Sequence, residues 1–129
     1  MAHDSPLIFD HIGFQVSDFA KTKAFLLAAL KPLEIEVVAE GEGWAMIGRG
    51  GKPQLWFGAL GPAPGPIHIA FAAANREQVR RFHAAALAAG GQDNGAPGLR
   101  EHYHADYYGA FVIGPDGHNI EAVCHAPEP

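Results

Sequence analysis

Two histidines begin matching tetrapeptides in this chain of 129 residues, and they are the first candidates for metal binding or proton transfer. His11 begins His-Ile-Gly-Phe, and His68 begins His-Ile-Ala-Phe, 57 positions further on. A neutral imidazole can bind Mn, Fe, Ni or Zn, and it can also carry a proton near neutral pH. A lone histidine on a strand is more often structural or on the surface, so it is the repetition that favours a metal site.

Polar and aromatic side chains gather in the segment 101–108, Glu-His-Tyr-His-Ala-Asp-Tyr-Tyr. Such a loop suits a lid over a cleft, and it equally suits a solvated loop whose tyrosines pack on the surface. Within it, His104 is the candidate for an extra metal ligand or a proton-transfer group, and Tyr103 for substrate contact. Trp56 and Tyr108 could line a pocket, although strand aromatics more often serve ordinary sheet packing.

The composition excludes several classes of protein. The formal net charge is −5 and the nine Lys and Arg residues are scattered, so a nucleic-acid-binding surface is not expected. Cys124 is the single cysteine and cannot form an internal disulfide, which favours a reducing compartment. Neither a signal peptide nor an apolar run of roughly 18 residues is evident, so a cytoplasmic protein without a membrane segment is expected. No GxSxG, P-loop or GxGxxG motif is present.

The elements that must position these residues fall into two sets. In the first set, the pattern predicts a strand over 6–16, then a helix that starts after Ser17-Asp18 and ends at Pro32. Three strands follow, at 34–40, 44–49 and 53–59.

The second set repeats this order. A strand at 67–73 precedes a helix that Asn75 caps and Gly90-Gly91 end. The stretch 92–99 is turn-rich, with only a short strand expected near Leu99. Two strands, 107–113 and 119–124, close the chain around the turn 114–117. On these elements we expect Cys124 to be buried, His83 to lie at the edge of the core and His118 to be exposed.

The repeat defines the expected domain organisation. Two units of the order strand, helix and three strands form one domain over 1–129. The first module spans 6–60, the second spans 67–125, and the Pro- and Gly-rich segment 61–66 links them.

The segments HIGFQVSD, HIAFAAAN and YYGAFVIGPDGHNIEAV together resemble the vicinal oxygen chelate superfamily, which includes glyoxalases, bleomycin-resistance proteins and dioxygenases. The resemblance covers nearly the whole chain in the right order. It implies an α+β fold of two βαβββ modules that form a curved mixed sheet around a cleft with a divalent metal. It also implies a homodimer, because in many members two chains combine their modules; whether the ligands meet within one chain or across two is left open.

The same resemblance assigns metal ligands. His11, His68 and Glu121 fall on the family's ligand positions, and this donor set suits Zn, Ni, Mn or Fe and leaves coordination positions open. Glu121 taken alone could also be an exposed strand carboxylate. The fourth ligand of glyoxalase-type members is missing: the internal repeat places Trp56 opposite Glu121, and Gln54 lies two residues away on the same face.

Two functions follow as expectations. The first is a metal-dependent enzyme, lyase-, isomerase- or dioxygenase-like, acting on a small molecule with vicinal oxygens. Its catalytic candidates are Glu121 and His104, and its substrate-binding candidates are Gln54, Trp56, Tyr103 and Tyr108. The alternative is a metal-free protein of the bleomycin-resistance type that sequesters a small molecule.

Overall fold

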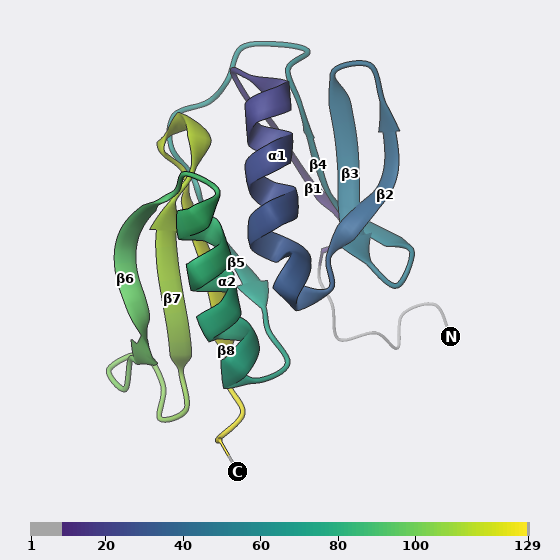
Figure 1. Ribbon diagram of the computed structural model, residues 1–129. Helices are drawn as coiled ribbons and strands as arrows, with labels where there is room; N and C mark the ends of the chain where they lie inside the picture. Colours follow the sequence, from purple (N-terminus) through teal and green to yellow (C-terminus); the bar gives the residue numbers. More distant parts are fainter. Residues whose placement is uncertain (1–8, 129) are drawn as a thin grey trace.

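The computed structural model describes residues 9–128 and contains two four-stranded mixed sheets and two long helices (Figure 1). The elements of the first half are β1 (Ile12–Gln15), α1 (Phe19–Leu30), the 3-10 turn η1 (Lys31–Leu33), β2 (Glu36–Gly41), β3 (Trp44–Arg49) and β4 (Lys52–Gly58). Those of the second half are β5 (His68–Ala72), α2 (Arg76–Ala88), β6 (Gln92–Leu99), β7 (Tyr108–Ile113), the 3-10 turn η2 (Pro115–Gly117) and β8 (Asn119–Cys124). The predicted fold of two βαβββ modules is confirmed.

The two sheets have the same topology. Their strand orders are β1-β4-β3-β2 and β5-β8-β7-β6, and in each the first strand runs parallel to its neighbour while the others are antiparallel. The helix between the first and second strands of each module provides the crossover that a parallel pair needs. The expected strand at 6–16 is shorter in the structure, since β1 begins at Ile12, and its positions 6–8 lie outside the described residues.

The prediction for 92–99 was wrong, because this stretch forms the continuous strand β6. Its Gly and Pro residues look like turn signals in the sequence. However, β6 is an edge strand with irregular pairing to β7 between Asp93 and Gly98, and an edge tolerates Pro97 and such irregularities.

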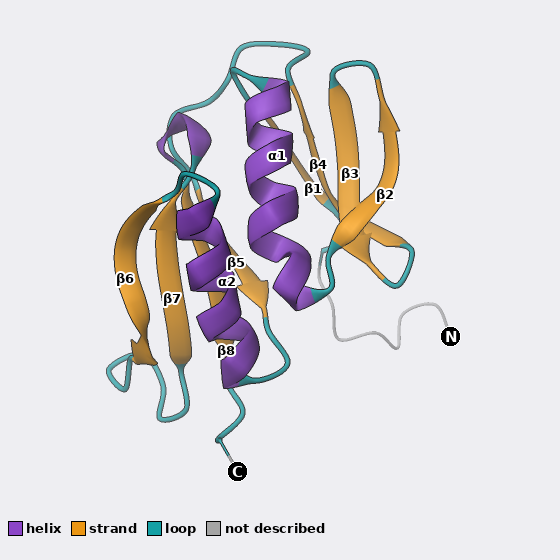
Figure 2. Ribbon diagram, viewed as in Figure 1, coloured by secondary structure: helices purple, strands orange, loops and turns teal. Residues whose placement is uncertain are grey.

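Both helices begin at the predicted caps. The Asp18 side chain accepts a hydrogen bond from the Lys21 amide, and the Asn75 side chain accepts one from the Gln78 amide. Each helix covers one face of its own sheet, and the two helices pack against each other (Figure 2). Their apolar stripes share one core with the inward strand residues; the largest fully buried apolar side chains include Leu30, Ile47, Phe57, Phe82 and Val112.

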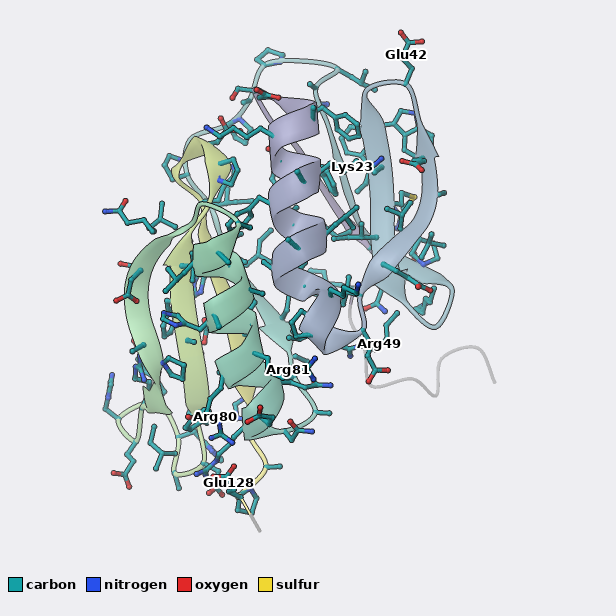
Figure 3. The ribbon with its side chains drawn as sticks, viewed as in Figure 1. Lys23, Glu42, Arg49, Arg80, Arg81 and Glu128 are labelled. Atoms are coloured by element: carbon teal, nitrogen blue, oxygen red, sulfur yellow. The ribbon has the colours of Figure 1, made fainter. Side chains whose placement is uncertain are left out.

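Side chains from both halves meet at the junction of the modules. The Ser17 amide donates to the Asp116 carboxylate over 2.9 Å, and the Ser17 hydroxyl donates to the same group. Arg49, labelled in Figure 3, donates to the carbonyls of Leu33 and Ala72, 2.9 Å each, and so ties the end of β3 to the end of β5.

His118 corrects another expectation, because it is buried rather than exposed. Its Nδ1 accepts the Ile67 amide over 3.0 Å, and its ring meets the edge of Phe14 from the first module at 5.2 Å between centroids. Cys124, in contrast, is buried as predicted, and His83 lies at the core edge with Nε2 3.0 Å from Asp93. No helix in the described part of the chain is long and apolar enough to cross a membrane.

Candidate metal centre

The parallel strands β5 and β8 bring His68 and Glu121 together. Ala70 pairs with Glu121 in the register, so His68 and Glu121 share the sheet face that no helix covers. His68 Nε2 lies 2.8 Å from Glu121 Oε1. The Glu121 side chain is 0% exposed whereas that of His68 is 52% exposed, so the exposed-carboxylate interpretation of Glu121 is wrong.

Tyr107 holds the other carboxylate oxygen. Its hydroxyl donates a hydrogen bond to Glu121 Oε2. Burial raises the pKa of the Tyr107 phenol, and the hydrogen bond and charge of Glu121 raise that pKa further, so the phenol stays a donor at any physiological pH. Gly109 leaves the space for this contact, because a Cβ there would lie 3.2 Å from Glu121 Oε2.

Sequence reasoning missed Tyr107 and selected its neighbour Tyr108. The Tyr108 ring lies near the guanidinium groups of Arg76 and Arg80, at 5.1 and 5.8 Å, on the face that α2 covers. Arg80 in turn pairs with Glu128 over 2.8 Å (Figure 3). The alternation of strand faces could have identified Tyr107, because Tyr107, Gly109 and Phe111 are two residues apart and project to the same face. Phe111 lies next to His68, at 6.2 Å between ring centroids.

The first module carries the equivalent positions. Gly13 pairs with Trp56 as Ala70 pairs with Glu121, so Trp56 occupies the place of the carboxylate, as the internal repeat predicted. His11 lies just before β1, is 56% exposed in its side chain, and has Nδ1 2.8 Å from the Asp10 carboxylate. His11 and Gln54 line a cavity of about 220 Å³ whose other wall includes Ala70 of β5.

The structure brings two of the three predicted ligands, His68 and Glu121, into contact. Among residues 9–128, no group of three or more His, Cys, Asp and Glu side chains is arranged to hold a metal ion. The structure therefore unites His68 and Glu121 and leaves His11 with Asp10.

The loop that contains His104 lies beside Tyr107. The Tyr103 ring meets the Tyr107 ring at 5.0 Å, and His125 bridges Tyr107 at 5.3 Å and His104 at 5.5 Å, all between centroids. The Asp106 amide donates a hydrogen bond to His104 Nδ1 over 3.2 Å, so Nε2 is the ring nitrogen that His104 can offer to another partner. The expected lid residues thus form a cluster of rings around Tyr107.

The donor atoms of the second module fit a divalent metal. The His68 imidazole nitrogen and a Glu121 carboxylate oxygen lie 2.8 Å apart, and both are ligands that Mn, Fe, Ni and Zn accept. No Lys or Arg forms a salt bridge to the buried Glu121 within residues 9–128. A buried carboxylate without such a partner gains most from a cation, which is the usual condition of a metal ligand.

Comparisons with known proteins identify the family to which the chain belongs. The family model of the Glyoxalase/Bleomycin resistance protein/Dioxygenase superfamily matches residues 8–122, and the chain belongs to that superfamily. A glyoxalase/bleomycin resistance protein from Albidiferax ferrireducens is 28% identical, with a TM-score of 0.78 over 93% of this chain and 100% of that one. A family enzyme from Burkholderia phytofirmans is 16% identical, with a TM-score of 0.69 over 91% and 98%, and shows the fold alone. No curated protein matches.

Proposed function

We propose that this protein is a divalent-metal-dependent enzyme that acts on a small molecule with vicinal oxygens. The observation that carries the proposal is the meeting of His68 Nε2 and the fully buried Glu121 Oε1, 2.8 Å apart, on the open face of the second sheet. When bound, Zn, Ni, Mn or Fe would polarise the substrate oxygens as a Lewis acid.

The chain's own residues would prepare this site. Tyr107 fixes Glu121 so that one carboxylate oxygen stays directed at the position beside His68. The rings of Tyr103 and Phe111 flank Tyr107 and His68 and would exclude water from one side of the substrate. His104, at the outer edge of the ring cluster, would transfer a proton through its Nε2.

The metal proposal is tested with protein purified without an affinity tag or added metal. We expect uptake of about one equivalent of Zn or Ni per chain, and loss of that uptake in His68→Ala. His83→Gln is the matched control, because His83 lies on α2, pairs with Asp93 through Nε2, and should leave uptake unchanged. Uptake below about a tenth of an equivalent by the wild type would instead support the metal-free sequestration protein.

We propose further that His11 of one chain completes the site of a second chain. The support is that one chain presents two half-sites, with His11, Gln54 and Trp56 on one sheet and His68 and Glu121 on the other. The two-fold symmetry common in homodimers would bring unlike modules together at two equivalent places.

Mixing variants separates the two arrangements. His11→Ala and His68→Ala chains each lack one ligand of every site, so neither binds metal tightly alone. If sites are shared, a mixed dimer recovers one intact site, built from the His11 of one chain and the His68 of the other. Refolding the two variants together should then restore up to about a quarter of the wild-type metal content at random pairing. If each site lies within one chain, the mixture should bind no more than the separate variants.

A further inference from the structure

Arg100 is the cation that lies on the open face of the second sheet. All nine Lys and Arg residues belong to the described part of the chain. The other eight lie on the helices and η1 or around the β3–β4 turn: Lys21, Lys23, Lys31, Arg49, Lys52, Arg76, Arg80 and Arg81. Figure 3 labels Lys23, Arg80 and Arg81, which belong to the two helices.

Backbone pairing sets the direction of the Arg100 side chain. The Arg100 amide donates to the Tyr107 carbonyl over 2.7 Å, directly after the Leu99–Tyr108 pair of β6 and β7. Directly paired residues on neighbouring strands project to the same face. Arg100 therefore shares a face with Tyr107, the residue that holds Glu121.

The guanidinium is held in a fixed position on this face. Its two terminal nitrogens donate to the carbonyls of Gly98 and Ala96, over 2.8 and 2.9 Å. Gly95 and Gly98 provide the room, since a Cβ at either would lie 3.1 to 3.2 Å from a guanidinium nitrogen. A guanidinium has five N–H donors, so this arrangement leaves several free for a ligand while the fork is already oriented.

Phe111 connects this cation with the candidate metal ligands. The Arg100 guanidinium carbon lies 5.4 Å from the Phe111 ring centroid, and the His68 ring lies 6.2 Å from the same centroid. The half-buried Phe111 ring thus lies near both the fixed cation and His68, and its apolar surface adjoins both groups.

We propose that Arg100 is the anion-recognising residue of this site and that the substrate is a small organic acid. Its carboxylate pairs with the Arg100 fork, its carbon skeleton lies on Phe111, and its vicinal oxygens face His68 and Glu121. This assignment rests on the proposed function, because it places the substrate oxygens at the metal. A planar carboxylate matches the guanidinium in two parallel hydrogen bonds, which a neutral group of the same shape cannot reproduce.

A purely structural Arg100 is the competing interpretation, since the same contacts could simply hold the irregular end of β6. The two interpretations of Arg100 predict different changes in the binding of an acid and of a matched neutral ligand when Arg100 is replaced. Structural loss would weaken every ligand alike, whereas loss of anion recognition would weaken only the acid.

The test uses zinc-loaded protein, because zinc has no redox chemistry and leaves catechols intact. The probes are 3,4-dihydroxybenzoate and its neutral isostere 3,4-dihydroxybenzamide, measured by isothermal titration calorimetry. The wild type should bind the acid at least about tenfold more tightly than the amide, which corresponds to about 1.4 kcal/mol. Arg100→Gln should remove this preference and leave amide binding unchanged, and Arg100→Lys should keep only part of it because the fork is lost.

A second variant keeps the positive charge of Arg100 but changes the position of its guanidinium. Gly98→Ala should displace the guanidinium and lower the acid preference without changing zinc content. Equal weakening of both probes in Arg100→Gln, an unchanged preference there, or failure of the zinc-loaded wild type to bind either probe would overturn the assignment of Arg100. If the wild type takes up no zinc at all, the proposed function itself fails, so the two failures are distinguished by the metal titration.

Discussion

At the scale of the residue, Glu121 is the buried carboxylate among residues 9–128. It is fully buried, its two oxygens contact His68 and Tyr107, and neither partner is a permanent cation. Burying a carboxylate costs free energy unless hydrogen bonds and a positive charge compensate. The arrangement is therefore expected to be most stable when a metal ion shares the carboxylate with His68.

Tyr107→Phe tests the positioning of that carboxylate. Removing the hydroxyl frees Glu121 Oε2, so we expect zinc or nickel affinity to fall by about 10- to 100-fold, measured by competition with a chelator of known affinity. Tyr108→Phe is the matched control, because Tyr108 lies on the helix side, near Arg76 and Arg80. Equal affinity in Tyr107→Phe and wild type would show that the phenol does not position the ligand.

At the scale of the element, the contact of β1 with the turn before β8 joins the two modules. His118 is central to it: the ring packs on Phe14, Nδ1 accepts the Ile67 amide, and Nε2 has no hydrogen-bond partner within residues 9–128. Burial lowers the pKa of His118, and the charge of Asp116 offsets this only in part. The junction is therefore built for the neutral imidazole.

The pH dependence of unfolding tests this junction. The folded-state pKa of His118 lies below its ordinary value of 6.5, so the unfolded chain binds the proton first as pH falls. The contribution of His118 to stability is thus intact above pH 6.5 and is lost below it, by up to about 1.4 kcal/mol per pH unit until the folded-state pKa is reached.

His118→Asn can retain the acceptor for the Ile67 amide and does not titrate. In urea unfolding between pH 5 and 7, we expect the variant to lose less stability than the wild type as pH falls. Parallel curves for the two proteins would show that His118 does not control this dependence.

At the scale of the whole molecule, the two sheets have the same topology, and each carries part of the predicted ligand set. A site that needs both parts from different chains would link metal binding to association, because a metal that binds only the dimer stabilises it by mass action.

Dilution tests that linkage. With excess zinc, the thermal midpoint of unfolding should rise, and both the midpoint and the apparent zinc affinity should fall as the chain is diluted below the dimer dissociation constant. The measurement is differential scanning fluorimetry over a range of protein concentrations. A zinc affinity that does not change with protein concentration, in a range where light scattering shows dissociation, would indicate a site within one chain.

Local patterns predicted most of the fold. The caps Asp18 and Asn75, the turn at 114–117 and the repeated His tetrapeptides are short-range signals, and the βαβββ order follows from them. The strand β6 was missed because its Gly and Pro residues resemble a loop until β7 is present to pair with them. His118 was placed wrongly because the ring that buries it, Phe14, lies far away in the sequence.

The candidate site divides in the same way. By itself, the sequence determined the residue types, the equivalence of His11 with His68 and the missing carboxylate at Trp56, because a repeat compares positions without needing coordinates. Only the tertiary structure decided that Tyr107 rather than Tyr108 meets Glu121, that Glu121 is buried and that Arg100 shares its face. The physical reason is that a one-residue step along a strand reverses the face, and the pairing of distant strands fixes which face is buried.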